Sequence, residues 1–236
     1  MPTHPPSRTA EALLGARRTL PVLVAVAPVA AVFGALAVER GWSAGQALAA
    51  SAFVYAGASQ FVMLDLHGQG VPAWAIVLTV LAVNFRHVLY SAAIGRRMGA
   101  FAPWQKAMAF FFLVDPQFAD GELRAREARL TPAFWFGYAG ALWATWMLAN
   151  AVGIAFGAMI RNPAHWGLDL ILPLYFLALV VSLRNTHRFA GIVATSALVA
   201  LVAVEVLGTP WHIMSGGAAG MVYAAWRTPR PGPQPA

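Results

Sequence analysis

Long apolar runs separated by short polar segments dominate the pattern of this chain. Most of these runs approach or reach the ~20 residues that a helix needs to cross a ~30 Å hydrocarbon core. They lack the period-2 alternation that the strands of a membrane barrel require. The pattern therefore predicts an all-α, polytopic integral membrane bundle with seven or eight transmembrane segments. The runs are residues 20–38, 46–65, 72–95, 104–118, 133–160, 168–183, 189–207 and 209–226.

The run at 104–118 decides between seven and eight helices. As a helix it would extend for only about 22 Å. Asp115-Pro116 interrupts it, because proline cannot donate the hydrogen bond that a continuous helix needs. The run either crosses the membrane with a kink or enters and leaves by the same face. The two alternatives place the N-terminus on opposite sides.

The ends of the chain are polar. Residues 1–19 predict a short proline-rich tail, residues 20–226 a single transmembrane domain, and residues 227–236 a disordered tail. A cleaved signal peptide is an alternative interpretation of the first apolar run. Further apolar runs follow it directly, which favours a membrane span.

Composition and charge agree with a membrane protein. Hydrophobic residues make up 59% of the chain and charged residues 11%, whereas soluble domains carry ~25% charged residues. The net charge of +7 comes from short basic clusters between apolar runs, which is typical of cytoplasmic loops rather than of nucleic-acid binding. We expect a multi-pass protein of the inner (plasma) membrane, embedded in the lipid bilayer. Its 119–131 loop and its C-terminus are expected in the cytoplasm.

A short internal similarity links two apolar runs. VAAVFGALAVERGWS at 29–43 resembles VGIAFGAMIRNPAHWG at 152–167, with Phe-Gly-Ala at the same place in each. Many transporters are inverted repeats with broken helices around a central site. If 104–118 does not cross the membrane, these two runs are expected to be antiparallel, as an inverted repeat requires. Small-residue packing between membrane helices is the alternative explanation.

Polar residues lie halfway along the run at 72–95. The sequence VLAVNFRHVLYS places Asn84, Arg86 and His87 near mid-bilayer, where a charge costs at least ~2.5 kcal/mol. Asn84 and His87 share one helical face, and Arg86 points elsewhere. Arg86 suits a substrate carboxylate, and His87 suits proton coupling because imidazole titrates near neutral pH. In the alternative, structural interpretation, Arg86 pairs with a buried acid or caps a broken helix.

A small-residue segment, YAGASQF, lies inside the second run. Gly57 and its small neighbours allow the helix to unwind, which offers free backbone groups to a zwitterionic substrate beside Tyr55 and Gln60. Close helix packing, with Gln60 bonding across helices, explains the same residues equally well. The candidate substrate-binding residues are Tyr55, Gly57, Gln60, Asn84 and Arg86.

Two acids complete the candidate site. Asp115 ends an apolar run, where it is either a partner for a substrate ammonium or a proton, or an ordinary loop residue. Glu205 lies within an apolar run, where an acid needs a partner, and Arg86 is a candidate for that role. Together with His87, these acids are candidates for coupling transport to an ion gradient.

Patterns for catalysis and cofactor binding are absent from the sequence. The chain has no cysteine and contains no GxxxxGK[ST], HExxH or GxSxG. We therefore predict that the chain is not an enzyme and has no catalytic residues, no metal and no cofactor.

Several of these motifs resemble the AzlC family, the large subunit of a two-component exporter of branched-chain amino acids. Gln60, Asn84, Arg86, His87 and Asp115 fall on family motif positions. The family typically has Asp-Glu where this chain has Asp115-Pro116, so a second acid is missing here. The resemblance is carried by FVYAGASQF at 53–61, NFRHVLYS at 84–91, Asp-X-X-Phe at 115–118 and GLDLILPLYFLALVVSL at 167–183.

The resemblance implies an activity and a partner. The activity is export of branched-chain or similar hydrophobic neutral amino acids, coupled to protons or another ion. The partner is a small membrane subunit of the AzlD type, and a higher oligomer is compatible with this arrangement. A passive channel or facilitator for another small solute is the alternative. Only a coupled exporter responds to a collapsed proton gradient.

Overall fold

The computed structural model describes residues 7–157, 188–208 and 211–227, together with Leu174, Leu177, Val180, Val181 and Arg184. Within this part of the chain all regular secondary structure is helical, so the predicted all-α class is confirmed. The predicted run at 168–183 lies largely outside the described residues, as do 1–6 and 228–236. The helices are α1 (Arg8–Glu39), α2 (Ala44–Phe53), α3 (Gly57–Gly68), α4 (Ala73–Gly95), α5 (Pro103–Phe111), α6 (Asp115–Glu127), α7 (Pro132–Gly157), α9 (Phe189–Leu207) and α10 (Trp211–Arg227).

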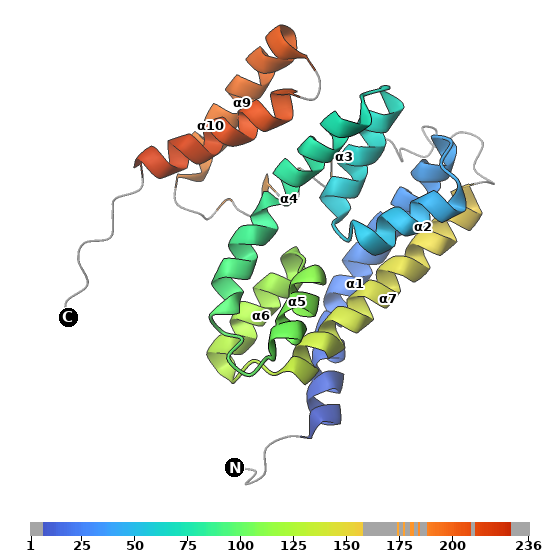
Figure 1. Cartoon of the computed structure of the whole chain (residues 1–236), viewed down its shortest axis with the longest axis vertical. Helices are drawn as coiled ribbons and strands as arrows, with labels where there is room; N and C mark the ends of the chain where they lie inside the picture. Colours follow the sequence, from blue (N-terminus) through green and yellow to red (C-terminus); the bar gives the residue numbers. More distant parts are fainter. Residues whose placement is uncertain are drawn as a thin grey trace.

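The long helices α1 and α7 pack along each other (Figure 1). They run parallel, because Gly15 faces the backbone of Phe134 and, further along both helices, Gly34 faces that of Asn150. A Cβ atom added at Gly34 or at Gly153 would collide with the backbone of the facing helix. Glycine therefore sets the close approach of the two helices, as small residues commonly do in membrane bundles.

The second predicted run forms two helices instead of one. The chain breaks at Val54–Ala56, between α2 and α3, where an interruption was predicted. After the break α3 returns to the start of α2: Arg40 pairs with Asp65 at 3.2 Å, and the Trp42 and His67 ring centroids are 5.6 Å apart. We call this re-entrant pair of helices hairpin A (Ala44–Gly68).

The run at 104–118 breaks in the same way. It is interrupted between α5 and α6, and Pro116 lies in the first turn of α6, where a proline costs no helical hydrogen bond. The residues at the start of α5 and just after α6 meet again, since Gln105 and Thr131 line one surface pocket. The run therefore leaves by the end at which it enters (Figure 1). We call this pair hairpin B (Pro103–Glu127).

The two hairpins enter the molecule from opposite ends (Figure 1). Because both return to the end from which they came, α4 is the only helix that runs from one end to the other between α1 and α7. This explains why α1 and α7 are parallel. The predicted antiparallel arrangement of the two Phe-Gly-Ala runs is wrong, and with it an inverted repeat that relates α1 to α7.

Four described helices are long and apolar enough to cross a membrane, namely α1, α4, α7 and α9. The predicted count of seven to eight is not confirmed. Hairpins A and B explain part of the difference, because at 1.5 Å per residue each of their helices is much shorter than a ~30 Å hydrocarbon core. Helices α9 and α10 pack against each other, and the rings of Trp211 and Trp74 connect α10 to the start of α4.

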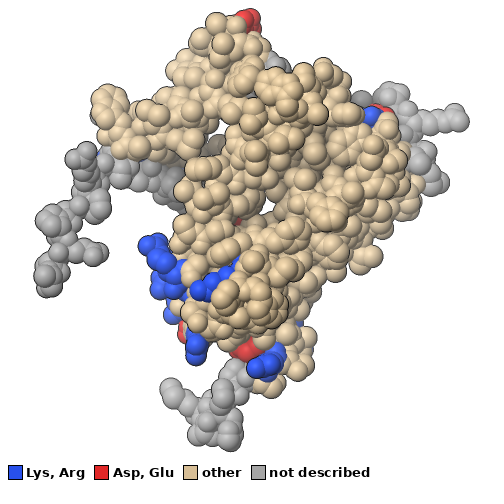
Figure 2. All heavy atoms as spheres, viewed as in Figure 1, with Lys and Arg blue, Asp and Glu red and all other residues tan. Residues whose placement is uncertain are grey.

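Basic residues gather at one end of the molecule, seen at the bottom of Figure 2. Ion pairs connect the helices at this end: Arg124 on α6 forms a buried pair with Glu11 on α1 at 2.9 Å, and the partly exposed Arg18 pairs with Asp120 and Glu127. We call it the basic end. Its Lys and Arg residues are Arg8, Arg17, Arg18, Arg96, Arg97, Lys106, Arg124, Arg126 and Arg129.

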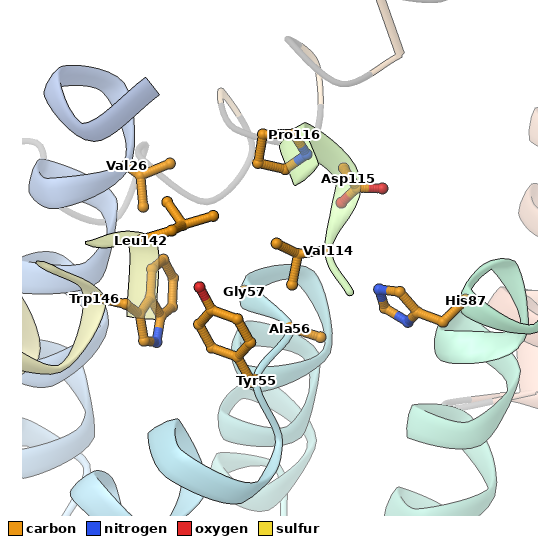
Figure 3. A pocket seen from close by; sticks show the side chains of 10 residues that line it. All are labelled: Val26, Tyr55, Ala56, Gly57, His87, Val114, Asp115, Pro116, Leu142 and Trp146. Atoms are coloured by element: carbon orange, nitrogen blue, oxygen red, sulfur yellow. The ribbon is translucent and has the colours of Figure 1, made fainter. Parts of the chain in front are cut away.

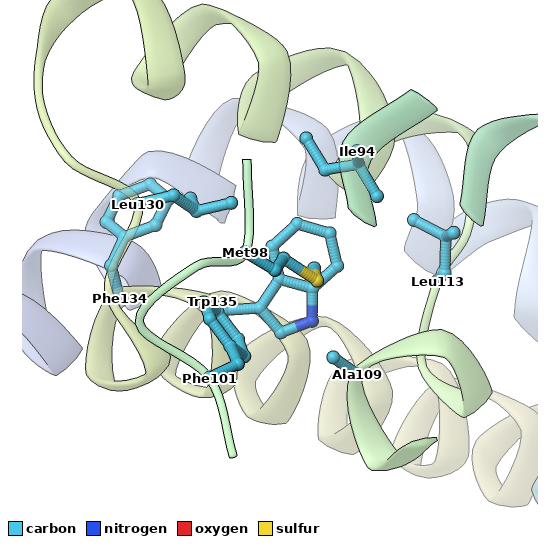
Figure 4. Close-up of a cluster of buried hydrophobic side chains, with 8 residues drawn as sticks. All are labelled: Ile94, Met98, Phe101, Ala109, Leu113, Leu130, Phe134 and Trp135. Carbon is cyan, nitrogen blue, oxygen red and sulfur yellow. The ribbon is translucent and has the colours of Figure 1, made fainter. Parts of the chain in front are cut away.

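An apolar cluster holds hairpin B against its neighbours (Figure 4). The Trp135 ring of α7 lies within it and meets the Phe101 ring edge to face, with centroids 6.4 Å apart. The cluster fixes hairpin B between α4 and α7 and so positions its tip. Its members are Ile94, Met98, Phe101, Ala109, Leu113, Leu130, Phe134 and Trp135.

Candidate functional site

The tips of the two hairpins meet. Tip A is Val54–Ala56 and tip B is Phe112–Val114. The rings of Tyr55 and Phe112 make an edge-to-face contact, with centroids 6.3 Å apart. Segments that enter from opposite ends of the molecule therefore come together, and the helix ends that flank them face the same region.

A cavity of about 50 Å³ lies between the tips (Figure 3). Helices α1 and α7 supply an apolar wall, and the tips and α4 supply polar groups. A water molecule needs ~10–15 Å³ of such volume, so the cavity has room for a few waters. It is lined by Val26, Tyr55, Ala56, Gly57, His87, Val114, Asp115, Pro116, Leu142 and Trp146.

Asp115 is the acid of this cavity. Its Oδ2 lies 3.1 Å from Nη2 of Arg86, and its Oδ1 accepts a hydrogen bond of 2.9 Å from the Tyr90 hydroxyl. Arg86 and Tyr90 are one helical turn apart on α4, so both reach the same carboxylate. Of the interpretations considered for Arg86, the structure shows the pairing with an acid, and that acid is Asp115.

Tyr55 presents an unpartnered hydroxyl to the cavity. Tyr55 is only 8% exposed, and its ring makes edge-to-face contacts with the rings of Phe112 and Trp146. Figure 3 shows the hydroxyl pointing into the space between Trp146 and Gly57. No described residue hydrogen-bonds it. A buried donor of this kind needs a partner, which a ligand can supply.

The two hairpin helices that begin at this site differ in charge. Helix α6 starts with Asp115, whose negative charge compensates the positive end of the helix dipole. Helix α3 starts at Gly57 with no acid in its first turn and no side-chain cap. Its first backbone N–H groups have no partner within the helix, and Gly57 lines the cavity. The start of α3 therefore suits an anionic group.

His87 lies between this cavity and a second one of about 250 Å³ on the other side of tip A. Its ring meets Tyr90 edge to face, with centroids 5.9 Å apart. Its Nε2 atom is buried and has no hydrogen-bond partner among the described residues. The His87 side chain lines both cavities.

Asn84 and Gln60 belong to a neighbouring polar network. Asn84 accepts a hydrogen bond of 2.6 Å from Ser59, which joins α4 to α3. Gln60 donates to Ser51 at 3.0 Å, and Ser51 donates to Asn150 of α7 at 2.9 Å. Gln60 does not line the cavity between the tips, and its hydrogen bond to Ser51 joins the two helices of hairpin A. Its contact matches the interhelical alternative considered above.

Glu205 is separate from this site. It is exposed on α9, which packs against α10, and it lines neither cavity. The pairing of Glu205 with Arg86 is therefore not found, since Arg86 pairs with Asp115. Among the described residues no group of three or more His, Cys, Asp or Glu side chains is arranged to hold a metal ion.

Sequence reasoning missed several residues of the site. Tyr90 could have been predicted, because it lies four residues after Arg86 and therefore on the same helical face. Leu142 and Trp146 of α7, and Asn150 one turn further, had no local signal. They lie in a uniformly apolar run, and only tertiary packing brings them to hairpin A.

Comparison with known proteins shows the family of this chain. The model of the AzlC protein family matches residues 21–160, more than half of the chain and including both hairpins. The chain belongs to the AzlC family. The inner membrane protein YgaZ of Escherichia coli K12 is 30% identical over 235 residues, which cover 95% of both chains.

More distant relatives of this AzlC-family chain are also membrane proteins. An uncharacterized membrane protein of Archaeoglobus fulgidus is 27% identical over 94% of this chain and 98% of its own length. One from Helicobacter pylori 26695 is 25% identical over 83% of this chain and 86% of its own. No solved structure matches the chain.

Proposed function

We propose that this AzlC-family protein exports branched-chain or similar hydrophobic neutral amino acids. The observation that carries the proposal is the cavity between the hairpin tips, which combines an apolar wall, a carboxylate and a free helix N-terminus. The resemblance of the tip and α4 motifs to the branched-chain amino acid exporter supports the same substrate class. A branched aliphatic zwitterion carries groups that complement all three features.

The substrate is oriented by charge. Its ammonium faces Asp115, and its carboxylate faces the start of α3 at Gly57 and the Tyr55 hydroxyl. Its aliphatic side chain faces the wall formed by Leu142 and Trp146. Half-helix N-termini bind substrate carboxylates in this way in other transporters. Arg86 was predicted to take this carboxylate; because Arg86 is held by Asp115, we propose the start of α3 for that role.

Transport requires the tips to separate. A cavity with room for a few waters is too small for a branched-chain amino acid, so the substrate binds when one hairpin moves. Hairpins A and B enter from opposite ends, and withdrawal of one or the other opens the site to one side at a time. This arrangement supports alternating access. His87, between the two cavities, and Asp115 are the residues proposed to couple the cycle to protons.

The basic end is proposed to face the cytoplasm, following the preference of Lys and Arg for that side. This places the N-terminus and the 119–131 loop inside. We also propose a cytoplasmic C-terminus, because α10 starts beside Trp74, at the end of the molecule opposite the basic end, and leads away from Trp74. The exposed apolar side of α4, with Val77, Leu81 and Val88 between 56% and 61% exposed, supports contact with lipid and with a small AzlD-type subunit.

Export of labelled leucine, valine and methionine from cells tests the proposal. We expect efflux that needs this chain, increases with the small subunit and falls when a protonophore collapses the proton gradient. Efflux that only equilibrates the amino acid, unaffected by the protonophore, would identify a passive facilitator. Absence of efflux with both subunits present would refute the proposed function.

A further inference from the structure

The ion pair between Arg86 and Asp115 is incomplete. Arginine and carboxylate groups in permanent structural pairs are frequently joined by two parallel hydrogen bonds. Here a single guanidinium nitrogen, Nη2, contacts Asp115, and Nε of Arg86 is buried without a hydrogen-bond partner among the described residues. Both side chains are half-buried, at 25% and 26% exposure. The contact neutralises the carboxylate but is more exposed than the Arg124–Glu11 pair, whose side chains are 13% and 6% exposed.

The two partners also differ in their access to the cavity. Asp115 lines the cavity and Arg86 does not (Figure 3). An ammonium group that enters the cavity therefore reaches the same carboxylate from the other side. An unpaired charge in a low-dielectric site costs several kcal/mol, so Asp115 needs a cation whether or not substrate is present.

We propose, on the basis of the function proposed above, that Arg86 is an internal substitute for the substrate's ammonium group. It holds Asp115 while the cavity is empty and yields it when an amino acid binds. The empty site is then neutral and moves between its two sides without a substrate. The pair thereby permits net export, whereas a carrier with an uncompensated Asp115 is restricted to exchanging one amino acid for another.

Ligand binding tests whether Arg86 competes with the substrate's ammonium group for Asp115 or instead binds the substrate's carboxylate directly. The full chain, produced with the small subunit, is tested in membranes with leucine, leucinol (ammonium, no carboxylate) and 4-methylpentanoate (carboxylate, no ammonium). Because Arg86→Gln removes the competitor, we expect leucine and leucinol to bind about tenfold more tightly. The affinity for 4-methylpentanoate should not change. Arg40→Gln, which removes the ion pair with Asp65 at hairpin A, is the matched control and should change none of the three.

Transport provides the second readout. In Arg86→Gln, net efflux of leucine into leucine-free medium should fall at least tenfold, while exchange of internal for external leucine continues. Arg86→Lys keeps the charge and should retain most of the net efflux, which guards against a folding defect. Weaker leucine binding in Arg86→Gln, or equal losses of net efflux and exchange, would overturn the inference. Failure of the unaltered protein to bind or move leucine would instead refute the proposed function.

Discussion

At the scale of single residues, the site depends on which polar groups are already satisfied. Asp115 is held by Arg86 and Tyr90, so its carboxylate is engaged within the protein. Gln60 donates to Ser51 through Nε2, and its buried Oε1 has no partner among the described residues. The Tyr55 hydroxyl has no hydrogen-bond partner among the described residues and faces the cavity (Figure 3). A hydroxyl that faces the cavity without a partner indicates that Tyr55 binds a ligand in addition to packing its ring.

Removal of this hydroxyl tests the binding role. A hydrogen bond to a charged group contributes ~1.5–3 kcal/mol, so Tyr55→Phe should weaken leucine binding by about tenfold or more. Tyr138→Phe is the control, because the Tyr138 hydroxyl donates to the Pro116 carbonyl at 3.4 Å and does not line the cavity. Binding of labelled leucine to membranes is the measurement. Equal affinities of Tyr55→Phe and the unaltered chain would remove Tyr55 from the site.

At the scale of helices, both hairpins are held by apolar packing, but their ion pairs differ in burial. Hairpin B is fixed by the apolar cluster around Trp135 and by the buried Glu11–Arg124 pair, which Thr131 completes with a 2.8 Å hydrogen bond to Glu11. Hairpin A packs against α1 through Phe61 and Leu64, and the Arg40–Asp65 pair at its open end is exposed. Pro116, in place of the acid typical of the family, leaves Asp115 as the acid of the cavity.

The buried pair should matter far more for stability than the exposed one. Breaking a buried ion pair costs ~3–5 kcal/mol, so Glu11→Gln should lower the free energy of unfolding by about 3 kcal/mol. An exposed pair contributes at most ~1 kcal/mol, and Arg40→Gln should have little effect. Thermal unfolding of the purified chain in detergent measures both. A larger loss in Arg40→Gln than in Glu11→Gln would contradict this view of the hairpins.

At the scale of the whole molecule, the return of both hairpins decides the topology. It puts the start of α1, the 96–106 loop and the 120–132 segment at the basic end, and the turns at 40–43 and 69–72 at the other. Neither sequence-based alternative for the run at 104–118 grouped the basic residues in this way. The grouping is strongly asymmetric, which favours a single orientation in the membrane.

The chain contains no cysteine, so single introduced cysteines report this topology directly. Thr9→Cys and Arg126→Cys at the basic end should resist a membrane-impermeant thiol reagent in intact cells, because the basic end is proposed to face the cytoplasm. Gln69→Cys, at the opposite end, should react. Both basic-end positions should react after the cells are opened. Labelling of position 9 in intact cells but not of position 126 would show that one hairpin crosses the membrane.

The sequence by itself determined the class of the protein and indicated two places where its helices could break. Apolar runs need helices in lipid, and Gly57 and Pro116 weaken continuous hydrogen bonding in the chain around them, so both conclusions rest on local chemistry. The residues of α4 were found for the same reason. A polar residue within an apolar run can be recognised from the sequence alone.

Only the tertiary structure decided what happens at each break and which groups meet there. Hydropathy along the chain is the same whether a broken helix continues or turns back. The sequence therefore left the run at 104–118 open and predicted antiparallel α1 and α7 only if that run does not cross the membrane. The turn depends on distant contacts, such as Trp42 with His67 and Phe101 with Trp135. The same long-range packing paired Arg86 with Asp115 instead of Glu205, because a charge pairs with the acid that folding brings within reach.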